Sequence, residues 1–328
     1  MAKSLITLVF LLLAPVSAKA QTDTLVIMSY NVENFFHPDD DPDKNDDAFT
    51  PDGSNHWTNY RMRQKAAKIS RVITSVNGWD CPQIIGLCEV EGPKAVEALL
   101  YEGGLSDDAL NYKAICYPTP DARGIAPALL YDADIVKIIS SYPISMSVPD
   151  SNFITRDVLY AKIKYATDTF HIFVNHWPSK YGGEAETVWK REHVARHTRS
   201  VCDSITATNP DAKIVLIGDF NDVASSDALA KVFGATRNGP DYINLSTFTN
   251  RHSYKYHGEW STIDHIIVSK SICSPERPWF FIGELNYLVE PDSRYVGYKP
   301  FRTYIGQRYN GGYSDHLPVF IKIPIYKK

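Results

Sequence analysis

The pattern of apolar and polar positions predicts strands, then helices, then strands again, without strict β-α alternation. Apolar and β-branched runs predict strands at 24–30, 83–90, 113–117, 126–131, 135–145, 157–165, 169–175, 213–217, 262–269, 279–288 and 317–325. Apolar residues at helical spacing predict helices over 57–76, 93–101 and 184–206, with a shorter one over 222–233. Two sheets packed face to face, with helices outside, would bury this pattern, so we expect a single α/β domain.

The N-terminus has the pattern of a targeting segment. Lys3 precedes an apolar run over 5–14, and Ala18-Lys19-Ala20 has the small-x-small form of a cleavage site. The run is short for a membrane span, and no later stretch is long enough. We therefore expect a signal peptide over 1–20 and an exported domain over 21–328, either periplasmic or secreted. An uncleaved membrane anchor is the alternative.

Charge and cysteine content narrow the picture further. Cleavage after Ala20 leaves 32 basic and 38 acidic side chains, a formal charge of −6, because it removes Lys3 and Lys19 and no acidic residue. That balance gives no global support to nucleic-acid binding, although a local basic groove is compatible with it. The five cysteines have no metal-type spacing, and an odd number leaves at least one thiol unpaired. Cys88, in an apolar run, is expected to be a small buried residue.

An acidic, proline-bearing loop is expected over 37–56. Within it, Asp41-x-Asp43-x-Asn45-x-Asp47 has the order of the first ligands of a calcium loop. Asp46 stands where such a loop needs glycine, so a solvated acidic loop is the expectation and a calcium site the alternative.

Several apolar runs are bordered by polar residues of the same few types. Any one such border can be a turn that satisfies only its own backbone. Their number instead predicts one polar crevice. Asp219 and Asn221 alternate, as would be needed for both to face one site from an extended segment. The bordering residues are Asn31, Glu33, Glu89, Asn175, His176, Asp219, Asn221, Asp264, His265, Asp315 and His316.

The residue types in this crevice point to metal-assisted chemistry. Glu89 and Asp315, with Asn31 and Glu33 nearby, form an oxygen-rich ligand set that suits Mg²⁺ or Mn²⁺ better than zinc. His176 and His316 supply acid-base groups, worth about 10²–10⁴-fold in rate. Such a set predicts in-line attack of water on phosphorus.

The ordered motifs resemble the endonuclease/exonuclease/phosphatase superfamily, which includes pancreatic-type deoxyribonuclease, abasic-site endonucleases, inositol-polyphosphate phosphatases and bacterial sphingomyelinases. The resemblance spans roughly residues 24–325 and implies a four-layered α-β-β-α sandwich (DNase I-like), with the site at one edge of both sheets. Its motifs are Ser29-Tyr30-Asn31-Val32-Glu33, Ile85-Gly86-Leu87-Cys88-Glu89-Val90, Asn175-His176, Gly218-Asp219-Phe220-Asn221, Ile263-Asp264-His265 and Ser314-Asp315-His316-Leu317-Pro318-Val319.

The resemblance also implies roles. Glu89 would be the principal metal ligand, with Asn31, Glu33 and Asp315 around it. Asp219 would orient or deprotonate the attacking water, and Asn221 would hold a phosphate oxygen. Asp264 would polarise His316, which contacts the scissile phosphate. His176 matches a second acid-base histidine of deoxyribonuclease-like members, which abasic-site endonucleases lack.

Four further residues are candidates for substrate binding. Arg123 is a candidate for gripping phosphate because a guanidinium binds two oxygens, although a surface arginine is the alternative. Trp260 is a candidate for stacking on a base or sugar, with a core tryptophan as the alternative. Asn175 and Lys180, on either side of His176, complete the set.

The leading hypothesis is an exported, monomeric, Mg²⁺-dependent phosphodiesterase that cuts nucleic acid without sequence preference. A second is a phosphatase of inositol-phosphate type or a sphingomyelinase-like phospholipase with the same centre. A lipid enzyme would expose an apolar hairpin, for which Trp279-Phe280-Phe281 is the candidate, although we expect these rings in the core. A third is an interaction module that has lost turnover, which the intact polar set disfavours.

Overall fold

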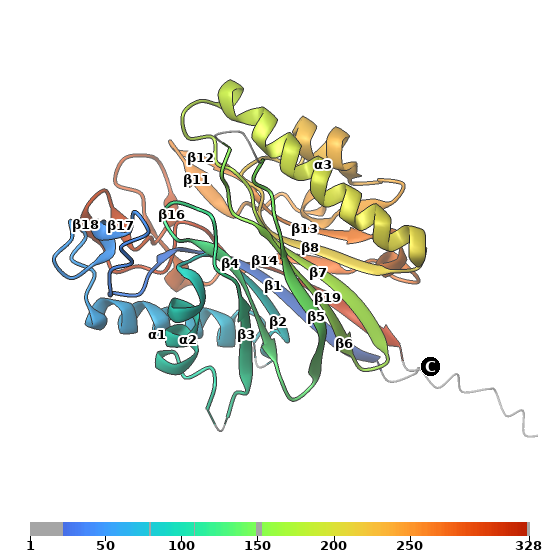
Figure 1. Cartoon of the computed structure of the whole chain (residues 1–328), viewed down its shortest axis with the longest axis horizontal. Helices are drawn as coiled ribbons and strands as arrows, with labels where there is room; N and C mark the ends of the chain where they lie inside the picture. The colour runs from blue at the N-terminus through green and yellow to red at the C-terminus, as the bar shows by residue number, and fades with distance from the viewer. Residues whose placement is uncertain (1–21, 79, 108, 149–152, 327–328) are drawn as a thin grey trace, which may run out of the picture.

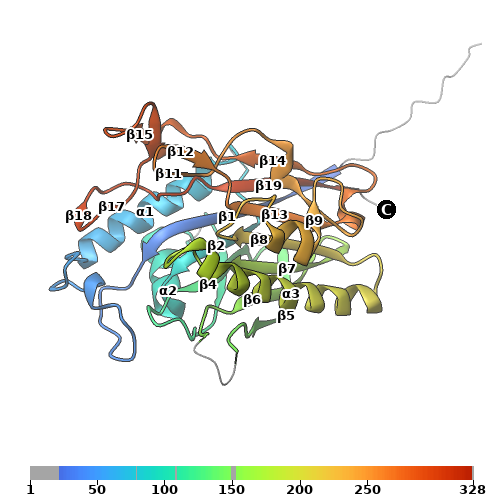
Figure 2. The same cartoon turned by 90° about the horizontal axis from the view of Figure 1, so that it is seen from above.

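Two mixed β-sheets packed face to face form the centre of the protein, and helices cover the outer faces (Figures 1 and 2). The computed structural model describes residues 22–78, 80–107, 109–148 and 153–326. The expected signal peptide over 1–20 lies outside these residues. The arrangement confirms the expected four-layered α/β sandwich.

The six-stranded sheet has the order β14-β19-β1-β2-β4-β3, and the seven-stranded sheet has the order β5-β6-β7-β8-β13-β10-β9. The strands of the first are β14 (Trp279–Ile282), β19 (Val319–Tyr326), β1 (Thr22–Phe35), β2 (Ile84–Val90), β4 (Ala126–Asp132) and β3 (Tyr112–Cys116). Those of the second are β5 (Val136–Ile144), β6 (Val158–Tyr165), β7 (Asp168–His176), β8 (Lys213–Asp219), β13 (Asp264–Ser269), β10 (Tyr242–Asn244) and β9 (Ala235–Thr236). The outer helices are α1 (Asn59–Ser75), α2 (Gly92–Glu102) and α3 (Glu184–Thr208).

In each sheet, one pair of parallel strands is connected through a long helix; the short strands β9 and β10 form a further parallel pair. β1 and β2 are parallel and connected through α1, whereas β7 and β8 are parallel and connected through α3. A helical crossover returns the chain to the same end of the sheet, so the carboxyl ends of both strands in a pair lie side by side. Two such ends, one from each sheet, can therefore contribute to one site.

The core has two parts. The larger fills the space between the sheets, where Gly86 of β2 faces Ile217 of β8 so closely that a Cβ at Gly86 would lie 2.6 Å from the Ile217 Cδ1 atom. The smaller lies under α3, whose Val194 and Ala195 pack with Phe173 of β7 and other apolar residues of the seven-stranded sheet.

Several boundaries differ from the prediction. The strand expected over 279–288 ends at Ile282, and a 3₁₀ turn follows at Asn286–Leu288. The helix expected over 222–233 is only a short π-helical turn at Ala228–Phe233, and residues 220–226 form irregular bends and a turn. The strand expected from 262 begins at Asp264. Three short hairpins were not predicted: β11 (Tyr254–Tyr256) with β12 (Glu259–Ser261), β15 (Val289–Pro291) with β16 (Tyr298–Pro300), and β17 (Tyr304–Ile305) with β18 (Arg308–Tyr309).

Other expectations about single residues can be compared with the structure. All five cysteines are unpaired, and Cys88 is fully buried, as expected. The aspartates of the acidic loop are exposed except for Asp46, which accepts a hydrogen bond from the Asp41 backbone N–H at 3.0 Å. Trp279, expected in the core, is 60% exposed, whereas Phe281 stacks on Phe320 at 5.0 Å between ring centroids.

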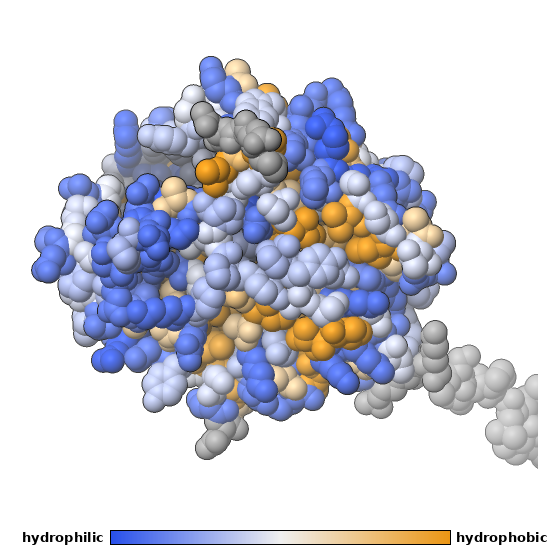
Figure 3. Space-filling model, in the orientation of Figure 1, coloured by the Kyte–Doolittle hydropathy of each residue, from blue (hydrophilic) through white to orange (hydrophobic). Residues whose placement is uncertain are grey.

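Within residues 22–326, the described helices are too short or too polar to cross a membrane. The surface over the acidic loop and the β17–β18 hairpin, on the left of Figure 3, is hydrophilic.

Candidate active site

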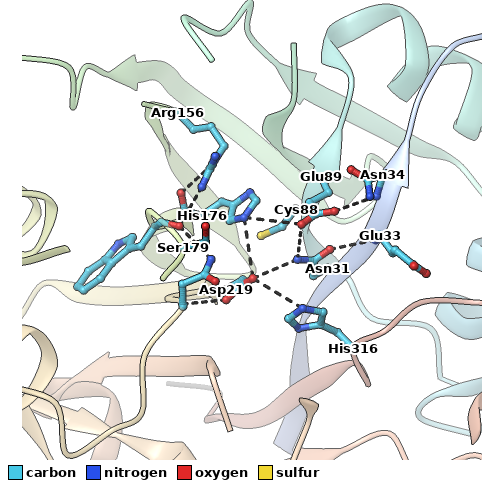
Figure 4. A network of polar contacts seen from close by, with 12 residues as sticks. Asn31, Glu33, Asn34, Cys88, Glu89, Arg156, His176, Ser179, Asp219 and His316 are labelled. Atoms are coloured by element: carbon cyan, nitrogen blue, oxygen red, sulfur yellow. Dashed lines mark hydrogen bonds and ion pairs between the residues drawn. The ribbon is translucent and has the colours of Figure 1, made fainter. Parts of the chain in front are cut away.

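Asn31 joins the two sheets at the carboxyl ends of their parallel pairs (Figure 4). From β1, its Nδ2 atom donates to Glu89 Oε1 of β2 at 3.2 Å and to Asp219 Oδ2 of β8 at 3.1 Å. Its Oδ1 atom accepts the backbone N–H of Glu33 at 3.0 Å, which fixes the orientation of the amide. One side chain thus holds a carboxylate from each sheet in the same place.

Two histidines complete a row of polar atoms across the site. His176 Nε2 lies 4.0 Å from Glu89 Oε1 and 3.9 Å from Asp219 Oδ2. His316 Nε2 lies 3.9 Å from the same Asp219 oxygen and 4.0 Å from Asp315 Oδ1. These distances are too long for hydrogen bonds but suit groups that act on a common ligand. The sequence-predicted residues Glu89, His176, Asp219, Asp315 and His316 therefore converge.

Asp264 holds His316 in position. The Oδ2 atom of Asp264 lies 2.9 Å from His316 Nδ1 and also accepts the Ser253 hydroxyl at 2.6 Å. Burial by itself would lower the pKa of His316, but the surrounding carboxylates, Asp264 foremost, raise it well above its ordinary value. These carboxylates therefore favour the protonated imidazolium of His316, whose Nε2 atom faces Asp219 and Asp315.

His176 has the opposite charge state. Burial lowers the pKa of His176 well below its ordinary value, and the nearby Arg156 and Arg123 lower it further. Arg156 is itself buried and donates to the carbonyl oxygens of His176 at 3.2 Å and Trp177 at 2.9 Å. These surroundings therefore favour the neutral imidazole of His176.

Asp219 lies between the two histidines and in register with His176 of β7 and Asp264 of β13. Burial raises the pKa of Asp219 to about 7, the imidazolium of His316 opposes that shift, and Asp264 adds to it. A carboxylate with a pKa near neutrality is suited to receive a proton and to release it again.

Asn221 does not point in the direction that strand alternation predicted. Its φ of +51° takes it out of the extended conformation, and its amide Nδ2 donates to the Trp177 carbonyl at 3.0 Å. The backbone N–H of Asn221 donates to Asp219 Oδ1 at 2.8 Å. In this structure Asn221 therefore orients Asp219, and contact with a phosphate oxygen stays a prediction.

Backbone strain is concentrated around the site. Among the described residues, seven that are not glycine have positive φ. Four of the seven are Glu33, Asn34, Glu89 and Asn221. Such conformations cost about 1–3 kcal/mol each and persist where function requires the geometry. With this backbone conformation, the Oε2 atom of Glu89 accepts a hydrogen bond from the backbone N–H of Asn34 at 2.9 Å.

The donor set fits a hard divalent cation. Glu89 and Asp315 reach the solvent side of the site, with side chains 19% and 20% exposed, whereas Asp219 and Asp264 are buried beneath them. Carboxylate oxygens open to water are the ligands that Mg²⁺ and Mn²⁺ use in proteins. A second set of possible ligand atoms, from Asp219, Asp264 and His316, lies within 4.8 Å of one another. The hydrogen bond between Asp264 and His316 accounts for this proximity. Glu89 and Asp315 are therefore the residues of the donor set that could hold such an ion.

The placements of Glu33 and Asn31 differ from the metal-ligand expectation. Glu33 turns away from Glu89 (Figure 4); it accepts the Thr303 amide at 2.5 Å and pairs with Arg302 Nε at 3.1 Å. Its φ of +52° ends the strand alternation that would have aligned it with Asn31. The Asn31 oxygen is committed to a backbone N–H, as described above. Neither the Glu33 carboxylate nor the Asn31 Oδ1 atom faces the space between Glu89 and Asp219.

Arg302 and Lys65 were missed by the sequence reasoning. Arg302 Nη2 donates to Asp315 Oδ2 at 3.0 Å, so it links Asp315 to Glu33. Lys65, fully buried on α1, donates to Thr303 Oγ1 and to the Tyr313 carbonyl. Burial lowers the pKa of Lys65 to about 8, which Glu33 partly offsets. Lys65 could have been found from the sequence, because it stands on the apolar stripe of a predicted helix. Arg302 and Arg156 have no comparable sequence signal.

The four substrate candidates have different outcomes. Asn175 is wrong as a substrate contact, since it is fully buried and its Oδ1 atom accepts the Trp177 indole N–H at 3.0 Å. Lys180 pairs with Asp222 at 3.1 Å and with Glu184. Arg123 is half-exposed, close enough to lower the pKa of His176, and stays a candidate. Trp260 packs against the core beside Lys255 rather than facing His316.

Comparisons with known proteins agree with this geometry. The sequence profile of the Endonuclease/Exonuclease/phosphatase family matches residues 26–325. No curated protein sequence matches the chain. Among solved structures, an endonuclease/exonuclease/phosphatase family protein from Bacteroides thetaiotaomicron is 17% identical, with a TM-score of 0.58 over 93% of this chain and 96% of that one.

Two further structures have the same fold. A mannosyl-6-phosphatase from Bacteroides thetaiotaomicron is 17% identical, with a TM-score of 0.57 over 92% of this chain and 100% of that one. TDP2 from D. rerio, solved with a single-strand DNA product, is 15% identical, with a TM-score of 0.54 over 91% of this chain and 98% of that one. Because the family profile covers nearly the whole described chain and the fold agrees with it, this chain belongs to the endonuclease/exonuclease/phosphatase family and is a phosphoester hydrolase.

Proposed function

We propose that the protein is an exported, Mg²⁺-dependent phosphodiester hydrolase that cuts nucleic acid without sequence preference. The observation that supports this most is the convergence of His176 Nε2 and His316 Nε2 on Asp219 Oδ2, each at 3.9 Å. Cleavage of a diester needs a proton acceptor for water and positive charge beside the phosphate, and Asp219 and His316 are placed for these two roles.

The side chains divide the work as follows. Asp219 accepts the proton of the attacking water; it is held by hydrogen bonds from the Asn31 side chain and the Asn221 backbone N–H. His316, kept cationic by Asp264, donates a hydrogen bond from Nε2 to a non-bridging phosphate oxygen. As the bond between phosphorus and the leaving oxygen breaks, His176, 3.9 Å from Asp219, passes the proton that Asp219 has taken from water to that oxygen. Glu89 and Asp315 would hold the divalent cation, which when bound would neutralise phosphate charge and polarise the phosphorus.

Alanine variants of His176, Asp219 and His316 test the assignment. Each is expected to lose about 10²–10⁴-fold in kcat on a phosphodiester while keeping the wild-type circular dichroism spectrum. Full turnover by all three variants on every diester and monoester tried would refute it. A matched control is His197→Ala, which removes an exposed histidine of α3.

A phosphomonoesterase is the second candidate. It is favoured by the acidic loop next to Arg123, where the Asn45 amide donates to the Ala122 carbonyl at 2.7 Å, because a long polyanion would be repelled there. One structure of this fold is a mannosyl-6-phosphatase. Parallel assays on plasmid DNA, single-stranded DNA, inositol phosphates, mannose 6-phosphate and sphingomyelin, each with Mg²⁺ or Mn²⁺, separate the candidates. Turnover confined to the monoesters would overturn the nuclease proposal.

Export is a separate part of the proposal and rests on the pattern of residues 1–20. Expression of the full chain with its own N-terminus in a bacterial host, followed by fractionation and mass spectrometry, is expected to give a periplasmic or released protein that begins at Gln21. A protein that keeps Met1 and stays in the cytoplasm would contradict it.

A further inference from the structure

The β11–β12 hairpin carries a row of aromatic rings that begins at the active site. The ring of Tyr254 lies 4.7 Å from that of His316, and Tyr256 follows with its ring nearly parallel to Tyr254, at 6.5 Å and 10°. His257 stacks on Tyr256 at 4.1 Å and 13°. In Figure 1 the hairpin lies above β16, at the end of the sheets where α3 begins.

The two faces of this hairpin differ. Tyr254 and Tyr256 alternate along β11, so both face the side on which His316 lies. Lys255, between them, faces the other side together with its cross-strand partner Trp260, and its Nζ atom lies 5.9 Å from the indole ring. Trp260 was the aromatic candidate for stacking on the substrate, with a core tryptophan as the alternative, and it packs against the core. The two tyrosines lie on the face toward His316 instead.

The base of the hairpin is part of the catalytic centre. Tyr254 pairs with His316 in an isolated antiparallel bridge, and the Leu317 amide donates to the Ser253 carbonyl at 2.7 Å. The hydroxyl of Ser253 also donates to Asp264. The rings therefore have a fixed position relative to the His316 Nε2 atom.

The hairpin is also held from its other side. Lys255 Nζ bonds to Asp292 at 2.9 Å and to the Tyr298 carbonyl at 3.0 Å, which ties β11 to the β15–β16 hairpin. The turn has positive φ at both central residues, +49° at His257 and +89° at Gly258, as a tight two-residue hairpin turn requires. Rings on such an anchored strand are preorganised for binding.

The spacing and exposure of the rings suit a planar ligand. Tyr256 is 61% exposed, and it follows Tyr254, whose ring contacts His316. The 6.5 Å between the two tyrosine centroids approaches twice the stacking distance of nucleic-acid bases, about 3.4 Å, so a planar ring can enter between them after a small side-chain movement.

We propose that Tyr254 and Tyr256 form a stacking subsite for a nucleobase adjacent to the scissile phosphate that His316 contacts. This inference rests on the proposed nuclease function and specifies how the site holds its substrate. Stacking would orient the nucleotide and contribute to KM, while the chemistry stays with His176, Asp219 and His316. It needs no particular base, in keeping with a nuclease without sequence preference.

The test compares oligothymidylate with a base-free oligomer of the same length, in which every nucleotide is an abasic tetrahydrofuran phosphate. Tyr256→Ala is expected to raise KM for oligothymidylate about tenfold, with little change in kcat, and to leave both parameters for the base-free oligomer unchanged. Tyr256→Trp keeps a ring and is expected to restore the wild-type KM. Tyr101→Ala, which removes an exposed tyrosine of α2, is the matched control.

Binding measured without turnover separates this inference from the proposed function. The Asp219→Ala protein is titrated with both fluorescently labelled oligomers, with and without Tyr256→Ala, and anisotropy gives each Kd. Weaker binding of oligothymidylate alone in the double variant supports the subsite, even if the wild-type protein cleaves only monoesters. Equal affinity of the Asp219→Ala protein for the two oligomers, or an equal loss for both on Tyr256→Ala, overturns it.

Discussion

At the scale of single residues, the site contains two imidazoles a short distance apart whose surroundings shift their pKa values in opposite directions. His316 has Asp264 on its Nδ1 atom, whereas His176 has Arg156 behind its backbone and a buried Nδ1 atom without a hydrogen-bond partner. The difference lies in the neighbours and not in burial, since both rings are buried.

Asp264→Asn tests this difference. The amide keeps the size of the carboxylate but no longer stabilises the imidazolium, so the pKa of His316 should fall. Because protonated His316 is the active form, kcat/KM is expected to decline with rising pH from a lower pH than in the wild-type enzyme, with about 10²-fold loss at pH 8. A variant with the wild-type pH profile of kcat/KM would show that Asp264 does not set the charge of His316.

The sequence was sufficient to predict which residues converge but not how each one points. Glu89, His176, Asp219 and His316 were predicted from polar residues at strand ends, and parallel pairing brings such ends together. Glu33 and Asn221 were predicted as site residues, but the directions of their side chains were not, because their positive φ values break the strand alternation that the prediction assumed. Conformations of this kind are imposed by tertiary contacts, and a single sequence without glycine at those positions gives no sign of them.

At the scale of elements, the long strands and helices were predictable because each has a long apolar period. The short hairpins after residue 250 were not, since their two- and three-residue strands have no period and depend on contacts such as that between Lys255 and Asp292. The hairpin with the proposed stacking residues is one of these. Its position next to His316 could be learned only from the structure.

The junction of β7 and β8 depends on Gly218. Its φ is +141°, and a Cβ there would lie 1.9 Å from the Asn175 carbonyl oxygen. Gly218→Ala is therefore expected to lower the free energy of unfolding by about 2–4 kcal/mol and, because Asp219 follows, to reduce kcat. Urea unfolding measures the first effect. Gly297→Ala, with φ of +89° and nothing within 4 Å, is the control and should cost only about 1 kcal/mol; equal losses for both would contradict the steric argument.

The pairing of β6 and β7 contains a pH-sensitive contact far from the active site. His171 of β7 is buried, and its Nδ1 atom lies 2.7 Å from the Tyr160 hydroxyl of β6. Burial lowers the pKa of His171 to about 4, and Lys162 contributes. An unfolded histidine titrates near 6.5, so the folded state binds fewer protons between those values and loses stability as pH falls from about 6.5 to about 4.

His171→Asn is expected to flatten this dependence, because the amide can still bond to Tyr160 and does not titrate. The measurement is the melting temperature of each protein at pH 7 and at pH 4.5, where the variant should show the smaller difference. His197→Asn, an exposed position on α3, should behave as the wild-type protein. An unchanged difference in the His171 variant would remove this residue as the source.

At the scale of the whole molecule, metal binding should stabilise the fold because the proposed ligands come from distant parts of the chain. Glu89 belongs to β2 and Asp315 to the loop before β19, and both lie on the six-stranded sheet's side of the site. A ligand that binds only the folded state at a hundredfold excess over its Kd adds about 2.7 kcal/mol.

Addition of Mg²⁺ or Mn²⁺ to protein treated with a chelator is therefore expected to restore activity and to raise the melting temperature by roughly 5 °C. Glu89→Gln should lose both effects. Glu290→Gln, which alters a half-buried glutamate paired with Lys299, should keep them. A melting temperature that does not respond to either cation, with full activity in chelator, would refute the metal site.

The amide of Asn31 is the one side chain in the site that bonds directly to a carboxylate of each sheet. The catalytic centre is thus assembled across an interface inside the protein, and neither half of the sandwich contains it alone. Any slippage of one half against the other would separate Glu89 from Asp219 before a single strand had come apart. The enzymatic rate therefore depends on the alignment of the two halves. On heating or in denaturant, activity should be lost before secondary structure is.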